Sequence, residues 1–478
     1  MKKGNDNDRL SLEYLFHPSS IAVVGVSSDL TRFRAGRLFT ESLVDAGFEG
    51  KLYPVGREGG KISGLEIYHS LRDIPDTVDY VISAIPAQHV PQLIVDCASK
   101  GVRAIHLFSA GFSEIDNKEG AQRQIQTAAL AQQMGIRIIG PNCMGLYCPK
   151  TRIVFHPDFP KESGRIGFLS QSGGNAIYAI REGATKGIYF SKVISYGNAS
   201  DLNECDFLEY LTYDPDTKII SAYIEGINDG TRFIKALKEA TQAKPVIIYK
   251  GGTTESGTRA VASHTGALAG SGMVWDSLFK QTGTLQVHSM EELLDMLLLF
   301  ECMSPPKGKA TAILGIGGGR SVQAADDCSK AGLTVPLLPA ETRRRLENLY
   351  ASETGASFRN PVDMYFARWD LAQETIKVVA NCDQIDLLII HINLGWNPRY
   401  EKNIIKPYVG LFTGLGKEIS KPTAIVLQPF GVARWAESAP EAEAALYEVG
   451  FPVYSSVGQA ARAIAKYVDY HRRQANAV

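Results

Sequence analysis

The sequence has few cysteines, no long apolar run and almost no net charge, and each absence excludes a class of protein. The seven cysteines form no CxxC pair, so we expect neither a structural zinc site nor a disulfide framework. No apolar run approaches the roughly 20 residues of a membrane-spanning helix. The formal net charge of -1 gives no global basic field that would recruit nucleic acid or an anionic membrane.

The N-terminal stretch MKKGNDNDRLSLEYLFHP is polar and lacks the apolar segment of a signal peptide. Hydrophobic residues make up 45% of the chain and charged residues 21%, which is typical of a soluble globular protein. We therefore expect a cytoplasmic protein. The length of 478 residues predicts roughly three domains of about 150 residues each.

One pattern occurs three times: an apolar run ends in a Gly/Ser loop, and a helix-compatible segment follows. The three runs are SIAVVGVSS (20–28), RIGFLSQSGG (165–174) and TAILGIGGGR (311–320). Each is typical of the first βα unit of a doubly wound domain. Further apolar strands and amphipathic helices follow each run, which predicts α/β domains with parallel sheets covered on both faces. The predicted domains are 1–148, 149–304 and 305–478.

The first loop invites a dinucleotide interpretation that its spacing does not support. A Rossmann fingerprint needs GxGxxG and an acidic residue about 20 positions later. Here Gly25 is followed by Ser27 and Ser28, and the next glycine is Gly36. An NAD-dependent dehydrogenase therefore has little support. The loop could cradle a phosphate through its N–H groups, or it could be a simple βα turn.

Polar residues follow successive strands of the second predicted sheet. Ser170, Ser172 and Gly173 end one strand before a helix, where hydroxyls, free N–H groups and the helix dipole make an anion site. A Gly-containing turn with a serine cap is the alternative. Asn198 and Glu225 end the next two strands. Because strand ends of one parallel sheet meet at one crevice, we expect these residues near one another.

The segment SHTGALAG (263–270) places His264 among small residues. A carboxylate that binds one imidazole nitrogen leaves the other nucleophilic, and small neighbours leave room for a phosphoryl group. Glu225 is the candidate carboxylate. A capping or solvated histidine is the alternative. Serine hydrolase chemistry fits less well, because SQSGG lacks the first glycine of a GxSxG elbow.

Together, the motifs SHTGALAG, GPNCMGLY, LSQSGG, SYGNASD and FSAGFSE resemble the CoA-binding and ligase subunit of ADP-forming acyl-CoA synthetases, in the succinyl-CoA synthetase superfamily. The resemblance covers essentially the whole chain. It implies a CoA-binding Rossmann-like domain followed by two flavodoxin-like domains. It also implies a relay through an acyl phosphate and a phosphohistidine that exchanges its phosphoryl group with ADP.

The resemblance implies roles for individual residues. The phosphohistidine falls on His264 and the glutamate that orients it on Glu225. The phosphate-binding positions are Ser170, Ser172, Gly173 and Gly266. The CoA contacts fall on Gly25, Ser27, Ser28, Ile85 and Pro86. Asn142, in GPNC, falls near the thioester end of CoA.

The resemblance further implies partners and substrates. ATP or ADP with Mg²⁺ needs an ATP-grasp portion, which we expect on a separate beta subunit in a heterotetramer. The organic substrate is a small carboxylic acid. Two stretches depart from the family: Gly56-Arg57-Glu58 stands where relatives often carry a CoA-contacting lysine, and GIGGGRS (315–321) replaces GGPG. A non-catalytic CoA-sensing homologue is therefore the alternative function.

Overall fold

Each of the three apolar runs forms the first parallel strand of a β-sheet, as the sequence predicts. The runs form β1 (Ser20–Val24), β9 (Ile166–Ser170) and β14 (Thr311–Gly315). All five residues of each strand are buried. Strands buried on both faces carry apolar side chains almost throughout, so polar side chains are confined largely to the loops that follow them.

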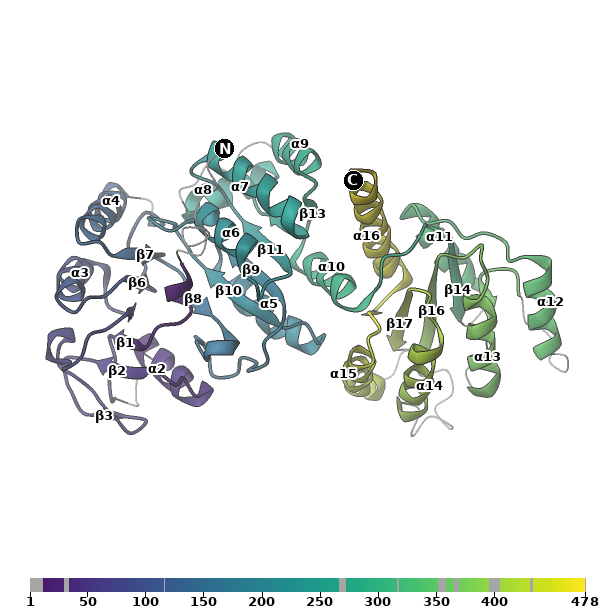
Figure 1. The fold of residues 1–478 in the computed structure, drawn as a ribbon, viewed down its shortest axis with the longest axis horizontal. Coiled ribbons are helices and arrows are strands. Elements are labelled where there is room, and N and C mark those ends of the chain that lie inside the picture. Colours follow the sequence, from purple (N-terminus) through teal and green to yellow (C-terminus); the bar gives the residue numbers. More distant parts are fainter. Residues whose placement is uncertain are drawn as a thin grey trace. The chain divides into compact units, whose positions relative to one another are not determined.

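The computed structural model describes residues 12–29, 34–115, 117–265, 272–315, 318–350, 358–364, 369–394, 405–429 and 433–477 (Figure 1). The chain divides into two compact units, 1–184 with 189–293 and 185–188 with 294–478. The first unit contains two large sheets and the second contains one. The domain boundaries near 148 and 305 remain predictions.

The first sheet has five parallel strands and belongs to the predicted CoA-binding domain, 1–148. Helices α3 and α4 lie on one face of this sheet and α2 on the other (Figure 1). A small hairpin of β3 (Lys61–Ile62) and β4 (Leu65–Glu66) lies outside it. The strands in spatial order are β2 (Lys51–Val55), β1, β5 (Tyr80–Ser83), β6 (Ala104–Leu107) and β7 (Arg137–Ile139).

The second sheet has six strands, of which five are parallel. Its edge strand β8 (Gly145–Tyr147) pairs antiparallel with β10, a feature that the sequence pattern did not predict. The capping box of Asn203 and Asp206 starts α6, and Asp229 caps α7. The strands in spatial order are β13 (Leu285–Val287), β12 (Val246–Lys250), β11 (Ile219–Ile224), β9, β10 (Phe190–Ser195) and β8.

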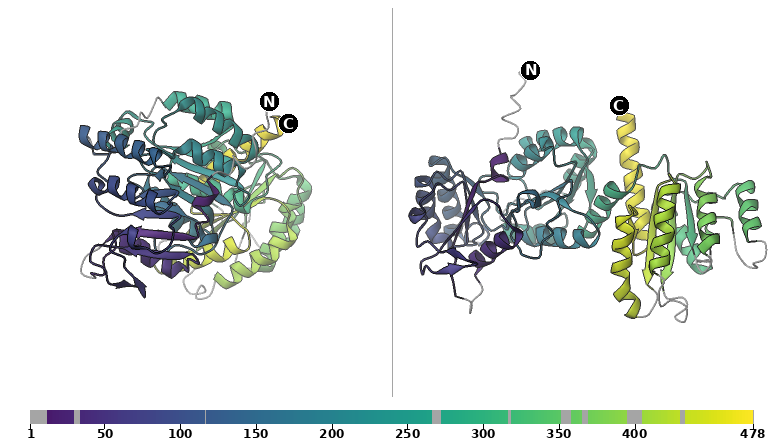
Figure 2. Two further views of the ribbon diagram at one scale, coloured as in Figure 1. Left: turned by 60° about the vertical axis from the view of Figure 1, so that its left-hand side comes forward. Right: turned by 60° about the horizontal axis from the view of Figure 1, so that its bottom comes forward.

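The third sheet is parallel and belongs to the second unit. Helix α11 packs against α16, which runs alongside the sheet (Figure 2). The strands in spatial order are β15 (Val362–Asp363), β14, β16 (Leu387–Leu394), β17 (Thr423–Pro429) and β18 (Val453–Tyr454). Numbered within each domain, the parallel strands of all three sheets have the order 2-1-3-4-5, which is the flavodoxin-like order.

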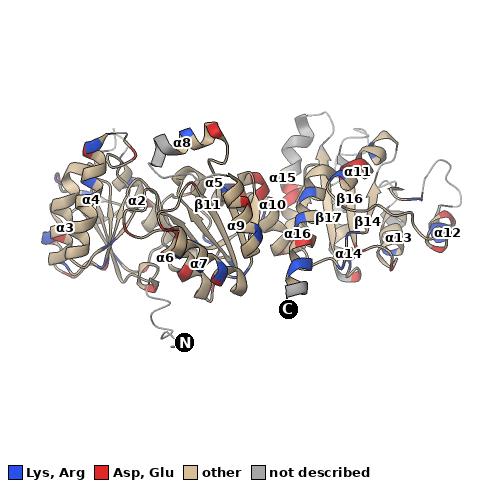
Figure 3. Ribbon diagram, turned by 90° about the horizontal axis from the view of Figure 1, so that it is seen from above, with Lys and Arg blue, Asp and Glu red and all other residues tan. Residues whose placement is uncertain are grey.

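The helices connect these strands in the alternating pattern that the sequence predicts, which confirms the α/β fold class. Lys and Arg are interspersed with Asp and Glu along them (Figure 3). No helix in the described ranges is long and apolar enough to cross a membrane. In the first unit the α-helices are α2 (Ala35–Ala46), α3 (Val90–Ser99), α4 (Lys118–Gln133), α5 (Gly173–Thr185), α6 (Glu204–Tyr213), α7 (Gly230–Ala243), α8 (Glu255–Thr265) and α9 (Gly272–Thr282). Helix α10 (Met290–Cys302) leads into the second unit, which continues with α11 (Gly319–Lys330), α12 (Ala340–Leu349), α13 (Trp369–Ala380), α14 (Ile405–Glu418), α15 (Ala433–Glu448) and α16 (Val457–Ala477).

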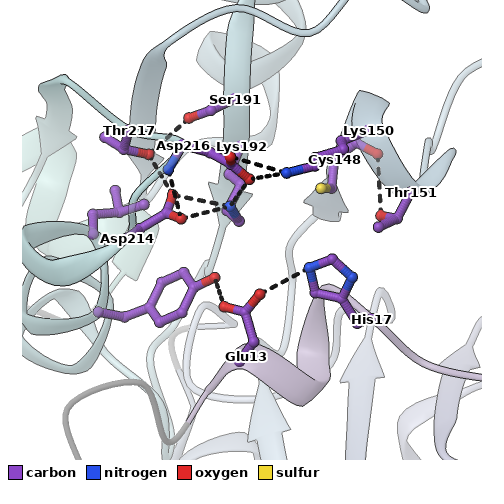
Figure 4. A network of polar contacts seen from close by, with 12 residues as sticks. Glu13, His17, Cys148, Lys150, Thr151, Ser191, Lys192, Asp214, Asp216 and Thr217 are labelled. Carbon is purple, nitrogen blue, oxygen red and sulfur yellow. Dashed lines mark hydrogen bonds and ion pairs between the residues drawn. The ribbon is translucent and has the colours of Figure 1, made fainter. Parts of the chain in front are cut away.

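A buried ion pair joins β10 to the turn that precedes β11 (Figure 4). The Lys192 ammonium lies 2.9 and 3.0 Å from the two carboxylate oxygens of Asp214, and both side chains are 1% exposed. The Thr217 hydroxyl donates to the same carboxylate at 2.6 Å. The ammonium also faces the ring of Phe16 at 5.5 Å from its centroid, so the pair anchors the segment that precedes β1.

We expect Asp214→Asn to destabilise the first unit by about 3 kcal/mol, because it leaves the Lys192 charge buried without its main partner. The measurement is denaturant-induced unfolding. Glu66→Gln is the control, because the Glu66–Lys61 pair is exposed and exposed pairs contribute roughly 0–1 kcal/mol. Equal costs for the two variants would contradict the assignment of the buried pair as a major contributor.

A second buried polar group, His106 on β6, supports the loop that follows β7. Its Nε2 lies 2.9 Å from the carbonyl oxygen of Cys143, and the ring packs edge-on against Phe39. Burial lowers the pKa of His106 to about 4, although the hydrogen bond to the Cys143 carbonyl favours the protonated form. The imidazole is therefore neutral at pH 7 and donates through Nε2.

Acid should destabilise the protein through His106. His106 binds a proton near pH 6.5 in the unfolded chain but only near pH 4 in the folded protein. The free energy of unfolding therefore decreases as the pH falls between these values. The difference corresponds to roughly 3 kcal/mol. His106→Gln retains an N–H donor and should flatten the pH dependence of the unfolding free energy between pH 6.5 and 4. An unchanged slope would rule out His106 as its source.

Candidate active site

Glu225 follows β11 directly and is buried, with 5% of its surface exposed. The Tyr223 hydroxyl donates to its carboxylate at 3.2 Å. The side-chain oxygen of Gln171 accepts hydrogen bonds from the backbone N–H groups of Glu225 and Gly226. The predicted carboxylate is therefore tied directly to the predicted phosphate loop, since Gln171 lies within that loop.

The loop 170–174 links β9 to α5, and its hydroxyls have distinct roles. The Ser170 hydroxyl is buried, donates to the carbonyl of Ser172 at 2.6 Å and accepts from the N–H of Ser172 at 3.2 Å. The Ser172 side chain caps α5 by accepting from the N–H of Asn175 at 3.3 Å. Ser170 thus shapes the turn, whereas Ser172, with Gly173 at the helix start, lies where an anion would be bound.

The loop after β7 packs against the phosphate loop. A Cβ atom on Gly173 would lie 2.8 Å from the Met144 side chain, so a side chain at this helix start would displace Met144. The Met144 N–H donates to the Ser195 hydroxyl at the end of β10 at 3.0 Å. The structure thereby brings the GPNCM segment of the first sheet beside the SQSGG segment of the second.

Asn142 lies in the same loop, with a positive φ of 57°. Its side-chain amide donates to the Asn198 side-chain oxygen at 3.4 Å. Asn198 in turn donates to the Glu114 carboxylate at 2.6 Å and to the side-chain oxygen of Gln124 at 3.1 Å. Strand-end residues of the first two sheets therefore form one polar cluster.

Glu114 is the charged member of this cluster. Burial opposes its ionisation, but N–H donors from Phe112, Gly111 and Asn198 outweigh burial and lower its pKa. Glu114 is consequently an acceptor that fixes the Asn198 amide. Glu114 is the last residue of the motif FSAGFSE, but the sequence alone indicates no role for it.

The predicted CoA loop follows β1 and touches the loop after β5. Gly25 has φ +102°, and a Cβ atom there would lie 2.7 Å from the carbonyl oxygen of Ala84. The N–H of Ala84 donates to the carbonyl of Val24 at 2.8 Å, and the Ser109 hydroxyl donates to the carbonyl of Ile85. Gly25 and Ile85 are therefore neighbours, as expected for residues at adjacent strand ends, and Pro86 follows Ile85 in the same loop.

The two serines of the CoA loop lie beside the stretch that departs from the family. The Ser27 hydroxyl donates to the exposed Glu58 carboxylate at 3.3 Å. A Cβ atom on Gly60 would lie 3.3 Å from the Ser28 hydroxyl oxygen. A carboxylate thus lies against the loop predicted to receive the CoA diphosphate.

Lys250 ends β12 and is 3% exposed. Its ammonium donates to the carbonyl of Glu225 at 2.7 Å and to the carbonyl of Gly251. It also lies 5.1 Å from the centroid of the Trp275 ring. Burial lowers the pKa of Lys250 to about 8, and the nearby Glu225 carboxylate partly opposes this effect.

His264 belongs to α8, but its side chain and the whole of Gly266 lie outside the part of the chain that the structure describes. Among the other predicted site residues, Glu225 is held by Gln171, which lies between the predicted residues Ser170 and Ser172, and Asn142 contacts Asn198. The contacts described for the Gly25–Ser28 loop are with the loops after β2 and β5. The roles of all these residues remain predictions.

The third sheet carries a separate cavity at its carboxyl edge. Its volume is about 390 Å³, and its lining includes Ser321, Arg359, Asn360 and Asp363. Residues 316–317 of the departing segment GIGGGRS lie outside the described residues. Beyond them, Arg320 donates to the Gln428 side-chain oxygen at 2.7 Å, and His391 Nε2 lies 3.1 Å from the same oxygen.

Sequence reasoning missed Gln171, Tyr223 and Lys250. Gln171 stood between two predicted serines, and Lys250 ends an otherwise apolar strand, VIIYK. A charged residue at the end of a buried strand is a usable signal, because such a residue needs specific partners. Contacts to backbone atoms leave no comparable pattern in a sequence.

Comparisons with known proteins show the family. Residues 19–149 match a CoA binding domain, and residues 163–300 match a succinyl-CoA ligase like flavodoxin domain. The chain is 37% identical to the Pyrococcus furiosus acetate–CoA ligase [ADP-forming] II subunit alpha, over 79% of this chain and 81% of the relative. It is 35% identical to the Archaeoglobus fulgidus acetate–CoA ligase [ADP-forming] I, over 79% of this chain but 54% of that longer relative.

A solved structure extends the similarity across nearly all of the chain. The Ca. Korarchaeum cryptofilum dinucleotide forming acetyl-coenzyme A synthetase 1, in complex with phosphate and ADP, matches with a TM-score of 0.81 and 30% identity. The match covers 97% of each chain. The predicted resemblance is therefore confirmed, and the chain belongs to the family of ADP-forming acyl-CoA ligases.

Proposed function

We propose that this chain is the alpha-type subunit of an ADP-forming acyl-CoA synthetase that works through a phosphohistidine at His264. It interconverts a carboxylic acid, CoA and ATP with acyl-CoA, ADP and phosphate. The observation that carries the proposal is the bond between Gln171 and the Glu225 backbone, which fixes a buried carboxylate beside the loop 170–174. Family membership supplies the reaction class.

Three transfers make up the proposed reaction in the direction of ATP formation. Phosphate attacks the acyl carbon of acyl-CoA, so a C–O bond forms and the C–S bond breaks to release CoA. His264 then attacks the acyl phosphate, forming a P–N bond and releasing the carboxylate. ADP finally takes the phosphoryl group, which breaks the P–N bond. Glu225 orients the imidazole and balances its positive charge.

The chain's own residues suit the anionic groups of this reaction. The free N–H groups at the start of α5, with the Ser172 hydroxyl, would hold the phosphoryl oxygens. Gly25, Ser27, Ser28, Ile85 and Pro86 would line the CoA site, because they meet at adjacent strand ends. Asn142 would lie toward the thioester, since its loop packs against the phosphate loop.

A partner subunit completes the proposed enzyme. The Pyrococcus furiosus relative is named a subunit alpha. We infer an ATP-grasp beta subunit that holds ATP or ADP with Mg²⁺, in a heterotetramer with this chain. The segment carrying His264 would then move between two sites. The identity of the carboxylic acid stays open, and the cytoplasmic location stays a prediction.

Labelling should reveal the phosphohistidine. When the chain is incubated with its ATP-grasp partner and γ-³²P-labelled ATP with Mg²⁺, we expect acid-labile, base-stable label on the wild type and none on His264→Ala. His17→Ala is the control, because His17 precedes β1 at the amino end of the first sheet and pairs with Glu13. Equal labelling of wild type and His264→Ala would reject the proposal. CoA binding with neither label nor turnover would favour a sensor.

The bond between Ser27 and Glu58 favours a second candidate, the non-catalytic CoA-sensing homologue. A carboxylate stands close to the loop predicted to bind the CoA diphosphate, where relatives often carry a lysine. Like charges would weaken CoA binding, as would the loss of a cation. The intact Glu225 arrangement counts against this candidate, because a sensor has no need of an oriented carboxylate.

Removing the Glu58 charge should strengthen CoA binding. We expect Glu58→Gln to lower the KM for CoA roughly two- to fivefold with kcat unchanged, a range set by the modest energy of exposed charge pairs. Glu66→Gln is the matched control, because this exposed glutamate pairs with Lys61 on the nearby hairpin. An unchanged KM would place the CoA diphosphate away from Glu58.

A further inference from the structure

Two buried side chains hold the peptide of Glu225 from opposite sides. Gln171 accepts hydrogen bonds from the N–H groups of Glu225 and Gly226, the second at 2.9 Å. Lys250 donates to the carbonyl of Glu225 at 2.7 Å. Exposed fractions of 6% for Gln171 and 3% for Lys250 keep water from replacing either contact.

The Lys250 ammonium also contacts the helix that follows the histidine segment. Trp275 belongs to α9, and its ring centroid lies 5.1 Å from the Lys250 nitrogen. The same ring packs against Phe233 of α7 and Phe279 of α9, which fixes its plane. Lys250 therefore connects the peptide of Glu225 to α9, whose first residue comes shortly after SHTGALAG in the chain.

A cation at this position is costly for folding. An ammonium removed from water is tolerated only where carbonyl oxygens and a ring face replace its hydration. A methionine would fill the space beside Trp275 without that cost. The distinguishing property of the lysine is its hydrogen bond to the carbonyl of Glu225, which an apolar side chain cannot make.

We propose that Lys250 is a positioning residue that, with Gln171, holds the Glu225 carboxylate in register with His264. This inference rests on the proposed function, in which Glu225 orients the phosphohistidine. Without the hydrogen bond from Lys250, the peptide after Glu225 is held on its N–H side by Gln171 but not on its carbonyl side, so it can shift at the end of β11 and the carboxylate moves with it. A displacement of about 1 Å at a reacting group can cost a hundredfold in rate.

Lys244 provides a control just before the other end of β12, where it ends α7. Its ammonium donates to the carbonyls of Leu211 and Asp214 at 2.6 and 2.7 Å. Burial lowers the pKa of Lys244 to about 8, as it does for Lys250. Both lysines donate to backbone carbonyls, but only Lys250 binds the carbonyl of Glu225; Lys244 is also less buried.

The test compares initial rates of labelling by γ-³²P-ATP in the complex with the ATP-grasp partner. We expect Lys250→Met to slow the labelling of His264 roughly tenfold to a hundredfold, and Lys244→Met to change it less than about twofold. Lys250→Met should add no further loss in a Glu225→Gln background, because a residue that acts only through Glu225 is coupled to it. CoA affinity should stay unchanged, since the CoA site is proposed at the first sheet.

Three results would overturn the inference. Equal effects of Lys250→Met and Lys244→Met would reduce Lys250 to a structural role, as would losses that multiply in the double variant. If wild type takes up no label, or Glu225→Gln labels as fast as wild type, the proposed function itself fails and this inference with it. If Lys250→Met does not fold, Gln171→Met replaces it, with Gln286→Met, whose amide binds Asp276 at 2.7 Å, as its control.

Discussion

The hydrogen bonds from Gln171 and Lys250 to the peptide after β11 are the contacts on which the proposed site depends. Glu225 follows the central strand β11 at the carboxyl end of the sheet, just beyond the last ladder pairs with β9 and β12. Polar groups buried there must find other partners or lose about 1–3 kcal/mol each. Side chains from the two flanking strands, β9 and β12, supply those partners. The carboxylate is therefore positioned by its own sheet.

The polar cluster around Asn198 connects the second sheet to the first. Asn198 follows β10 and binds Glu114, while its side-chain oxygen accepts from Asn142. The CoA-binding domain and the flavodoxin domain thereby share side-chain contacts between their strand ends. In the proposed reaction, an acyl group passing from CoA to phosphate would cross between the two domains, and rigid contacts at this boundary would hold the reacting groups within reach.

The fold could be predicted because each sheet starts with a buried apolar run and a Gly/Ser loop. The antiparallel strand β8 could not, since three residues, Gly145–Tyr147, are too few for a periodic pattern and their pairing depends on β10. Glu225 could be placed near the phosphate loop, because parallel strand ends share an edge. The hydrogen bonds of the Ser170 hydroxyl within its own turn, and those of Lys250 to backbone carbonyls, could not be predicted. Contacts to backbone atoms require no particular residue at the partner position, so they leave no sequence pattern.

Arg320, in the segment GIGGGRS that departs from the family, belongs to a group of hydrogen-bonded side chains in the third domain. Arg320, in the first turn of α11, donates to Gln428 on β17 at 2.7 Å. Burial lowers the pKa of His391 on β16, and the Arg320 charge lowers it further, against the hydrogen bond to Gln428. A neutral His391 can donate to the same Gln428 oxygen without adding a second positive charge. Arg320 therefore places a positive charge at the carboxyl edge of the third sheet. The hydrogen bond to Gln428 on β17 orients its guanidinium group.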